Sequence, residues 1–341
     1  MEPIPAPPMP PPPPEPVIPV LPAGLKFHAT AYTPDGGFSI TGLMLVLLGL
    51  GAAGIVMGVA TFYVSKLFYL IVLFPMLIGI ALGALGGFLV KRGKVRAPWL
   101  AGAAGLVAGL LAMLTQHYLE YHEFIGDDKH QIRVQAREQM KANPLAALFL
   151  LGIPKEEREN VKREIMVENF FDFMDYYAHV GVSIKHGPGG GANDKGMNLG
   201  YYGTYIYWLV EALIVACIVF AMTRKPALDP YCPLTSDWKV ARCGDNFMVP
   251  SEVGLDQVAA AVKEGALGML AQYKAAGTAA ASTTEPVRLY VYASPQHFEQ
   301  CTLDVKLVKF VPGKQGQVEE KEIAMATYPA EALASFEKFC N

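Results

Sequence analysis

Apolar residues run almost without interruption from position 40 to position 90, and this pattern predicts two membrane-spanning helices. The stretch of 51 residues holds a single charged residue, Lys66, whereas one crossing of the hydrocarbon layer takes roughly 20 residues. Aromatic residues flank Lys66, as they do at a membrane surface. We therefore predict one span at about 40–61 and a second at about 68–90.

Two further apolar stretches are also long enough to span. Residues 97–117 follow a short basic loop at 91–96, and residues 201–223 are followed by Arg224 and Lys225. Because Lys and Arg collect in short loops on the cytoplasmic side, both basic segments are expected there, and so are the N-terminus and the C-terminus. The expected location is an inner or plasma membrane of the bacterial type.

The segment between the third and fourth spans, residues 119–200, is expected to be a helical, non-cytoplasmic insertion. Its apolar stretch at 145–153 is too short to cross a membrane, so it is either a buried core helix or an interfacial one. Pro154 suits the first turn of a following helix, whose apolar residues keep mainly to one face as far as Tyr177. That helix either packs on residues 145–153 or lies in the lipid headgroups, and a glycine-rich loop then leads into the fourth span.

The two ends of the chain differ in composition from the spans. Residues 1–39 form a proline-rich tail, with 12 of the 26 prolines in the first 22 positions, so an extended spacer or a ligand for an aromatic groove is expected. Residues 224–341 carry ordinary charge and predict a small α+β domain. Its predicted helices are 256–276 and 330–339, and its predicted strands are 287–293, 302–311 and 319–327.

Composition agrees with a membrane protein and narrows its class. Hydrophobic residues make up 52% of the chain and charged residues 17%, with a net charge of −3. A soluble domain carries about a quarter charged residues, and a nucleic-acid binder needs clustered Lys and Arg in excess. We therefore expect membrane lipids and proteins as partners, and no nucleic acid.

Small residues recur at intervals of four in the first three spans. The stripes comprise Gly54 and Gly58 in the first span, Gly79, Gly83 and Gly87 in the second, and Gly105 and Gly109 in the third. In lipid, such a stripe lets two backbones approach closely. The stripes either hold the spans of one chain together, as in a glycine zipper, or mediate assembly of a homo-oligomer.

Glu211 is the one carboxylate inside a predicted span. An ionised carboxylate facing lipid is costly, so Glu211 is expected to be neutral, paired or turned toward a polar interior. His117, at the outward end of the third span, is a possible partner, and Thr115 or a tyrosine hydroxyl would also serve. The pair is either an interhelical hydrogen bond that fixes packing or part of a proton or ion relay.

Two sets of residues have metal-capable side chains. His117 and Glu120 share a helix face if the third span continues as a helix, and Cys232 and Cys243 resemble half of a zinc knuckle. A solvated helix end explains the first set equally well, and each cysteine lacks a near partner in C-x-x-C spacing. Cys232, Cys243, Cys301 and Cys340 all lie on the side expected to be reducing. No cofactor is expected.

The chain contains no nucleophile elbow, Walker motif, dinucleotide-binding motif or kinase signature. We therefore expect a non-catalytic, multi-pass membrane protein that anchors or scaffolds a membrane complex and binds protein partners through its cytoplasmic segments. The alternative is a small channel or proton-coupled transporter that uses Glu211.

Overall fold

The computed structural model describes residues 21–66, 73–128, 163–184, 197–279, 284–313 and 317–340, apart from Ala23 and Ile165, and some positions at 130–138. The chain forms two compact units. One comprises Met1–Pro34 and Asp229–Asn341, and we call it the sheet body. The other comprises Asp35–Leu228, and we call it the helix body.

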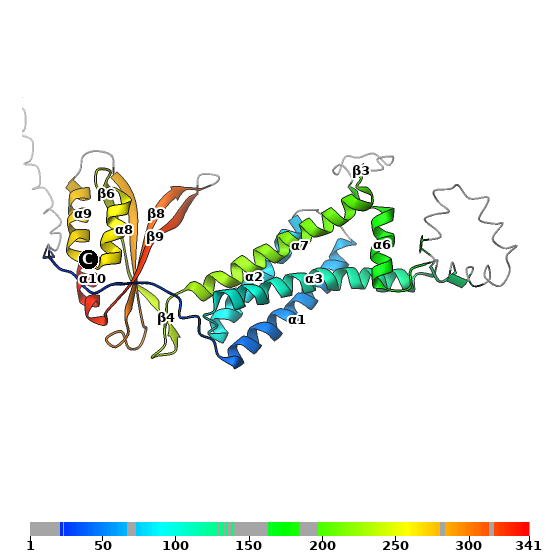
Figure 1. Cartoon of the computed structure of the whole chain (residues 1–341), viewed down its shortest axis with the longest axis horizontal. Helices are drawn as coiled ribbons and strands as arrows, with labels where there is room; N and C mark the ends of the chain where they lie inside the picture. The colour runs from blue at the N-terminus through cyan, green and yellow to red at the C-terminus, as the bar shows by residue number, and fades with distance from the viewer. Residues whose placement is uncertain are drawn as a thin grey trace, which may run out of the picture. The chain divides into compact units, whose positions relative to one another are not determined.

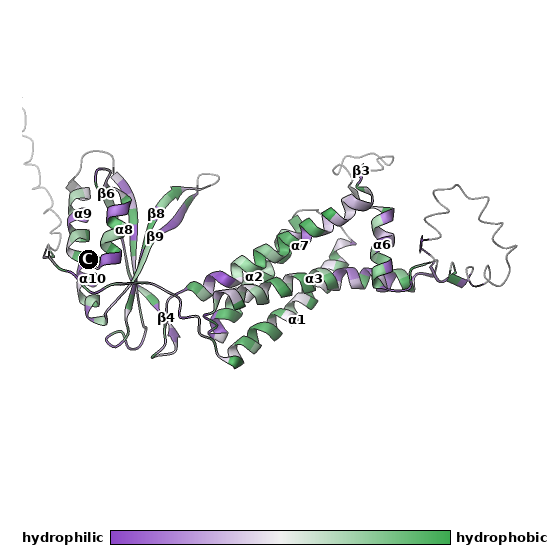
Figure 2. Ribbon diagram, in the orientation of Figure 1, coloured by the Kyte–Doolittle hydropathy of each residue, from purple (hydrophilic) through white to green (hydrophobic). Residues whose placement is uncertain are grey.

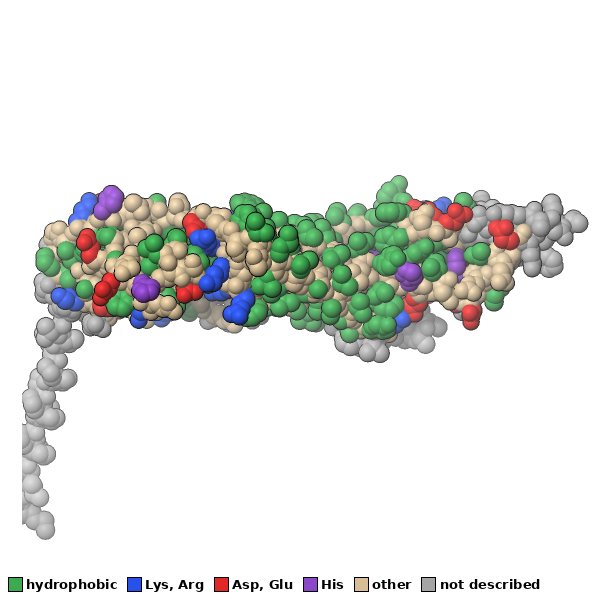
Figure 3. All heavy atoms as spheres, turned by 90° about the horizontal axis from the view of Figure 1, so that it is seen from below, with side chains coloured by type: hydrophobic (Ala, Val, Ile, Leu, Met, Phe, Trp, Pro, Cys, Tyr) green, Lys and Arg blue, Asp and Glu red, His purple; other side chains and the backbone are tan. Residues whose placement is uncertain are grey.

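Four helices of the helix body are long and apolar enough to cross a membrane: α1 Ile40–Ser65, α2 Leu73–Gly93, α3 Pro98–Gly126, and α7 Gly200–Arg224 with the 3-10 turn Lys225–Leu228 that continues it. Figure 2 shows these helices mostly green, as expected for helices that contact lipid. Apolar side chains cover this body in Figure 3, and acidic and histidine side chains gather toward its end near α6. The four predicted spans are therefore confirmed as candidate membrane helices.

Local sequence explains where these helices begin and end. Ser39 precedes α1, and its hydroxyl accepts a hydrogen bond from the backbone N–H of Gly42, which satisfies one of the unpaired donors of the first turn. Pro98 occupies the first turn of α3, where its missing N–H costs nothing. Lys91 and Arg92 lie in the last turn of α2, where cations complement the negative end of the helix dipole.

The described part of the insertion includes the end of α3, helical positions between 128 and 138 and at 163–164, the helix α6 Phe170–Val180, and a two-stranded ribbon of β2 Ser183–Ile184 and β3 Met197–Asn198. Asn169 and Asp172 form a capping box at the start of α6, so residues 170–177 of the predicted amphipathic helix belong to a helix of their own, whereas residues 154–162 lie outside the described residues. The short apolar stretch at 145–153 and most of the glycine-rich loop lie outside the described residues.

The sheet body is built on a five-stranded antiparallel sheet of order β1-β9-β8-β7-β6 (Figure 1). Its strands are β1 Thr30–Ala31, β6 Val240–Pro250, β7 Thr284–Ala293, β8 Leu303–Pro312 and β9 Val318–Tyr328. A separate ribbon pairs β4 Tyr231–Cys232 with β5 Asp237–Trp238. The helices are α8 Leu255–Glu264, α9 Leu267–Ala279 and α10 Leu333–Cys340, the last preceded by the 3-10 turn Ala330–Ala332.

One apolar core joins the helices of the sheet body to one face of its sheet. On β7 the buried positions alternate, Val287, Leu289 and Val291, with half-buried residues between them, because successive strand side chains point to opposite faces. These residues pack with Val262 of α8 and Phe336 of α10, among others, in a single cluster. The helices cover one face of the sheet, and the other face carries the intervening side chains.

Three features of the sheet body differ from the sequence-based expectation. The helix predicted at 256–276 is two helices, because Gly265 adopts a left-handed φ of 75° between α8 and α9. The long strand β6 was not predicted. Residues 21–31, assigned to the proline-rich tail, belong to this body, since Leu25 and Phe27 pack on its core and β1 pairs with β9.

Candidate functional site

The glycines of α1 lie against the backbone of α3. A Cβ added at Gly54 would stand 2.6 Å from the carbonyl oxygen of Ala108, and one at Gly58 would meet Ala112 and Thr115. No side chain larger than hydrogen fits at such distances without moving a backbone. This stripe of α1 is therefore occupied by a helix of the same chain.

The glycine stripes of α2 and α3 both face α7, the span without a glycine stripe of its own. A Cβ at Gly79 would meet Ile218, one at Gly83 would meet Met222, and one at Gly87 would meet Pro226. The third stripe behaves alike: Gly105 faces Thr223 and Val219, and Gly109 faces Val215 and Ala216. The large side chains of Ile218 and Met222 thus fill the groove of α2, whereas Thr223, Val215 and backbone atoms of α7 fill the groove of α3.

Glu211 is buried inside the helix body with 3% of its surface exposed. The hydroxyl of Tyr207, one turn earlier on α7, donates a hydrogen bond to its carboxyl group. This neighbour shares the helix face of Glu211, as i and i+4 residues do. A polar group inside an apolar span needs a hydrogen-bonding partner within the protein. Tyr207 supplies that partner for the Glu211 carboxyl.

His117 interacts with its own helix. Its Nδ1 lies 2.9 Å from Glu120 Oε2, and Gln116 donates to the other oxygen of Glu120 at 3.1 Å. The imidazole ring of His117 also packs 5.4 Å from the indole of Trp208 on α7. His117 thus links α3 to α7 through its aromatic contact with Trp208, while its ring nitrogen contacts the carboxylate of Glu120.

The aromatic residues at this end of the helix body extend from α7 onto α6. Tyr177 of α6 stacks on Trp208 with 6.0 Å between ring centroids, and burial together with the charge of Glu120 raises the pKa of its hydroxyl. A recess opens beside them. It is lined by Phe62, Ser65, Lys66, Glu120, Glu123, Phe124, Phe173, Tyr176, Tyr177 and Val180.

The four cysteines of the sheet body form two disulfides, Cys232–Cys301 and Cys243–Cys340. The fifth cysteine, Cys217, lies in α7 and is a free thiol. The zinc hypothesis required Cys232 and Cys243 at one ion, but the structure places them in different disulfides. Neither has a thiolate left to offer a metal, and this expectation is therefore corrected.

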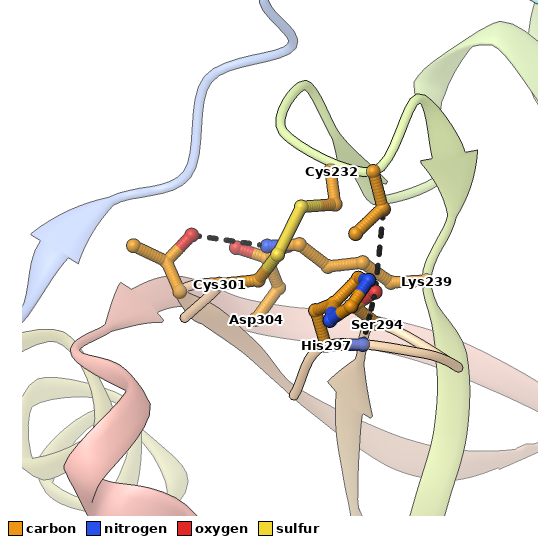
Figure 4. The surroundings of a disulfide bond; sticks show 8 residues. Cys232, Lys239, Ser294, His297, Cys301 and Asp304 are labelled. Carbon is orange, nitrogen blue, oxygen red and sulfur yellow. Dashed lines mark hydrogen bonds and ion pairs between the residues drawn. A yellow bond between two sulfur atoms is a disulfide. The ribbon is translucent and has the colours of Figure 1, made fainter. Parts of the chain in front are cut away.

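A buried ion pair lies close to the Cys232–Cys301 disulfide (Figure 4). Lys239 Nζ stands 2.5 Å from Asp304 Oδ2, and both side chains are almost fully buried. The ammonium group also donates to Thr302, and the hydroxyl of Thr327 donates to the second carboxylate oxygen at 2.7 Å. A buried charge needs this degree of pairing, since an isolated one would cost several kcal/mol.

Among the described residues, no group of three or more His, Cys, Asp or Glu side chains is arranged to hold a metal ion. His117 and Glu120 do lie together, as their spacing predicts, but they form a two-membered contact with Gln116 beside it. Gln116, His117 and Glu120 thus form a hydrogen-bonded polar cluster on α3.

The face of the sheet opposite the helices carries a group of aromatic and charged side chains. Arg288 Nη1 lies 2.9 Å from Glu320 Oε1, and the Tyr290 hydroxyl donates to the same oxygen at 2.9 Å. The Arg288 guanidinium also lies 5.2 Å from the centroid of the Phe310 ring. We call Arg288, Tyr290, Phe310 and Glu320 the open-face cluster.

The open-face cluster could not be found by a motif search. Its members come from β7, β8 and β9, and only the register of those strands brings them together. The available signal was the alternation of β7, in which Arg288, Tyr290 and Tyr292 fall on the face that the core does not use. Gly244 of β6 lies beneath the Tyr290 ring and leaves room for it.

Comparisons with known proteins add no relative: no protein family, curated protein or solved structure matches this chain.

Proposed function

We propose that this protein is a non-catalytic membrane anchor that holds a partner protein through the open-face cluster of its sheet body. The observation that carries the proposal is a sheet whose described helices pack on one face, with an arginine and two aromatic rings on the other. Arg and Tyr are the residues most enriched where proteins bind one another tightly. Charged residues of both signs around the rings suit a polar interface rim.

The packing of the helix body supports separate roles for the two bodies, with the helix body as the anchor and the sheet body as the binding part. Its glycine stripes are filled by its own helices, most of them by α7, so close packing of the spans needs no second copy of the chain. A helix body with its grooves filled in this way suits an anchor. The sheet body is then the part that presents a surface to a soluble or membrane-bound protein.

Site-specific photocrosslinking in native membranes tests the proposal. Tyr290 is replaced by the photoreactive residue p-benzoyl-phenylalanine, and Gln257, an exposed residue of α8 on the helical side of the same body, receives the same replacement as a control. We expect one discrete adduct with a different protein from position 290 and none from position 257. An adduct of twice the chain mass, or equal adducts from both positions, would contradict the proposal.

Co-purification in mild detergent provides the quantitative test. The double change Arg288→Ala and Tyr290→Ala removes the guanidinium and one ring of the cluster while the core side of β7 stays intact. We expect the amount of stoichiometric partner recovered to fall at least tenfold. Lys263→Ala, on the exposed side of α8, should leave that amount unchanged. Equal recovery with both variants would exclude the open face as the binding surface.

A second function, a channel or proton-coupled transporter, is favoured by one observation, the burial of the Glu211 carboxyl inside a span. Flux through the purified protein in liposomes distinguishes the two functions. A proton or ion flux that Glu211→Gln abolishes would establish transport. Under the anchor proposal we expect no flux under any gradient, and partner binding that is unchanged in Glu211→Gln.

A further inference from the structure

We infer that the sheet body matures in an oxidising compartment, where its four cysteines are joined in pairs, and that both of its chain segments therefore lie outside the cytoplasm. The insertion between α3 and α7 then faces the cytoplasm. This orientation is the reverse of the one that the basic loops favour. It holds for any function of the sheet body, including one other than anchoring.

The cysteines of the sheet body are completely paired. Each of the four cysteines in this body is in a disulfide, and the Cα–Cα distances are 6.5 Å for Cys232–Cys301 and 6.3 Å for Cys243–Cys340, within the usual range. Cytoplasmic reductants keep thiols reduced, so fully paired cysteines are typical of secreted, lumenal and periplasmic domains.

Each disulfide connects segments that are far apart in the sequence. Cys232 belongs to the small β4–β5 ribbon and is tied to the loop before β8, 69 residues away. Cys243 of β6 is tied to Cys340, the last residue of α10, across 97 residues. Both therefore fasten peripheral segments to the central sheet, which is how small extracytoplasmic domains supplement a limited core.

The chemistry requires an oxidant that the compartment supplies. Each pair loses two thiol protons and two electrons as its S–S bond forms. By thiol–disulfide exchange, a protein disulfide of the compartment takes up those electrons and protons and becomes a dithiol. Two pairs need two such exchanges for each chain. The reductants of the cytoplasm drive the same exchange in the opposite direction.

The N-terminal segment must share the compartment of the sheet body. Thr30 and Ala31 pair with Thr327 and Ala326 of β9, and the four candidate spans lie between these strands in the sequence. An even number of crossings returns the chain to the side from which it started. The structure thus requires both ends on one side, and the disulfides assign that side.

The opposing signal, the charge of the loops, is weaker than it first appears. The other side of the membrane also carries bases within about 20 residues of the span ends. They are Lys66, Lys129, Arg133, Arg137, Lys185 and Lys195.

The thiol state in intact cells tests the chemical half of the inference. Cells are quenched in acid, and the denatured chain is treated with a mass-tagging maleimide, with or without prior reduction. We expect one tag, on Cys217, without reduction and five tags after it. Five tags without reduction would overturn the inference.

Side-specific labelling tests the topological half. In a Cys217→Ala background, Lys263→Cys places an exposed thiol on α8, and the matched variant Asp128→Cys places one at the insertion end of α3. A membrane-impermeant maleimide applied to cells with a closed inner or plasma membrane is expected to label position 263 fully and position 128 only after permeabilisation. The opposite pattern would overturn the inference even if the disulfides are formed.

A second measurement adds no cysteine and is therefore independent of any mispairing in the labelled variants. Right-side-out vesicles carrying the unsubstituted chain, with an epitope after Asn341, are exposed to protease. Loss of the epitope from sealed vesicles supports an outward sheet body. Its survival until detergent is added would overturn the assignment.

Discussion

The helix body and the sheet body hold their elements together by opposite kinds of packing. In the helix body, contacts form where side chains are absent, as at Gly54 against Ala108. In the sheet body, they form where side chains are large and apolar, as at Leu289 and Phe336, and two disulfides are added. Lipid is as apolar as a leucine side chain, so burying apolar area gains little there and close backbone approach matters more.

This comparison predicts that the sheet body is sensitive to lost volume and lost cross-links, whereas the helix body is sensitive to added volume. Hydrogen exchange of the intact protein, read peptide by peptide, reports the two bodies separately.

The largest effect is expected from removing the Cys243–Cys340 disulfide with Cys243→Ser and Cys340→Ser. The bond closes a loop of 97 residues, and in the chain-entropy account its loss destabilises a domain by about 4 kcal/mol. Exchange should rise throughout the sheet body and stay unchanged in α1, α2 and α3. Cys217→Ser, the matched change in a free thiol, should alter neither body.

Leu289→Ala should have the next largest effect. Leu289 is fully buried in the centre of the sheet, and truncation of such a residue costs about 3 kcal/mol through lost apolar burial and a cavity. The matched change Leu48→Ala truncates a residue of α1 that is 71% exposed on the surface of the helix body. An equal fall in melting temperature for the two variants would contradict the difference proposed between the two bodies.

Gly54→Leu reverses the test by adding volume. The new side chain would collide with the backbone of Ala108, and overpacking of this kind costs about 2 kcal/mol. Gly51→Leu is the control on the same helix, because a Cβ there meets nothing within 4 Å. A helix body that tolerates leucine equally at both positions would show that its glycines do not determine the packing.

The smallest effect is expected from Tyr328→Phe, and it depends on pH. Burial raises the pKa of the Tyr328 hydroxyl, which donates a hydrogen bond to the Val262 carbonyl. Losing that hydrogen bond should cost about 1 kcal/mol near neutral pH.

The sign of the pH effect follows from the direction of that shift. The unfolded phenol loses its proton at about pH 10, below the folded one, so the stabilisation is present below that pH and is lost as the pH rises through the folded pKa. Burial of Tyr292 acts in the same direction. Melting of the wild type should therefore fall more steeply above about pH 10 than melting of the phenylalanine variant. Parallel curves would contradict this account.

Much of the helix body could be predicted from sequence because lipid imposes one simple requirement. A span must be long, apolar and helical, since its backbone groups can find partners only within the helix, and residues 40–90 meet this requirement without ambiguity. The stripe of Gly79, Gly83 and Gly87 was equally visible, but its partner was not. Ile218 and Met222, which fill it, are ordinary apolar residues of a span.

The sheet body was harder to predict because its contacts join residues that are far apart in the chain. Three of its strands were located within a few residues. Strand β6 was missed because its glycine, charged and polar positions, from Cys243 to Asn246, obscure the alternation. Nothing local to Cys232 or Cys243 indicates that their partners are Cys301 and Cys340.

The sequence by itself therefore determined the number of candidate spans, the small-residue stripes and the presence of an α+β region, because each depends on local composition and spacing. Only the tertiary structure decided that α7 fills the stripes, that residues 30–31 join β9, that the cysteines pair, and that the open-face cluster exists. The physical reason is the same in each case. These features arise from contacts between distant segments, whose formation depends on the whole fold and not on any one stretch of chain.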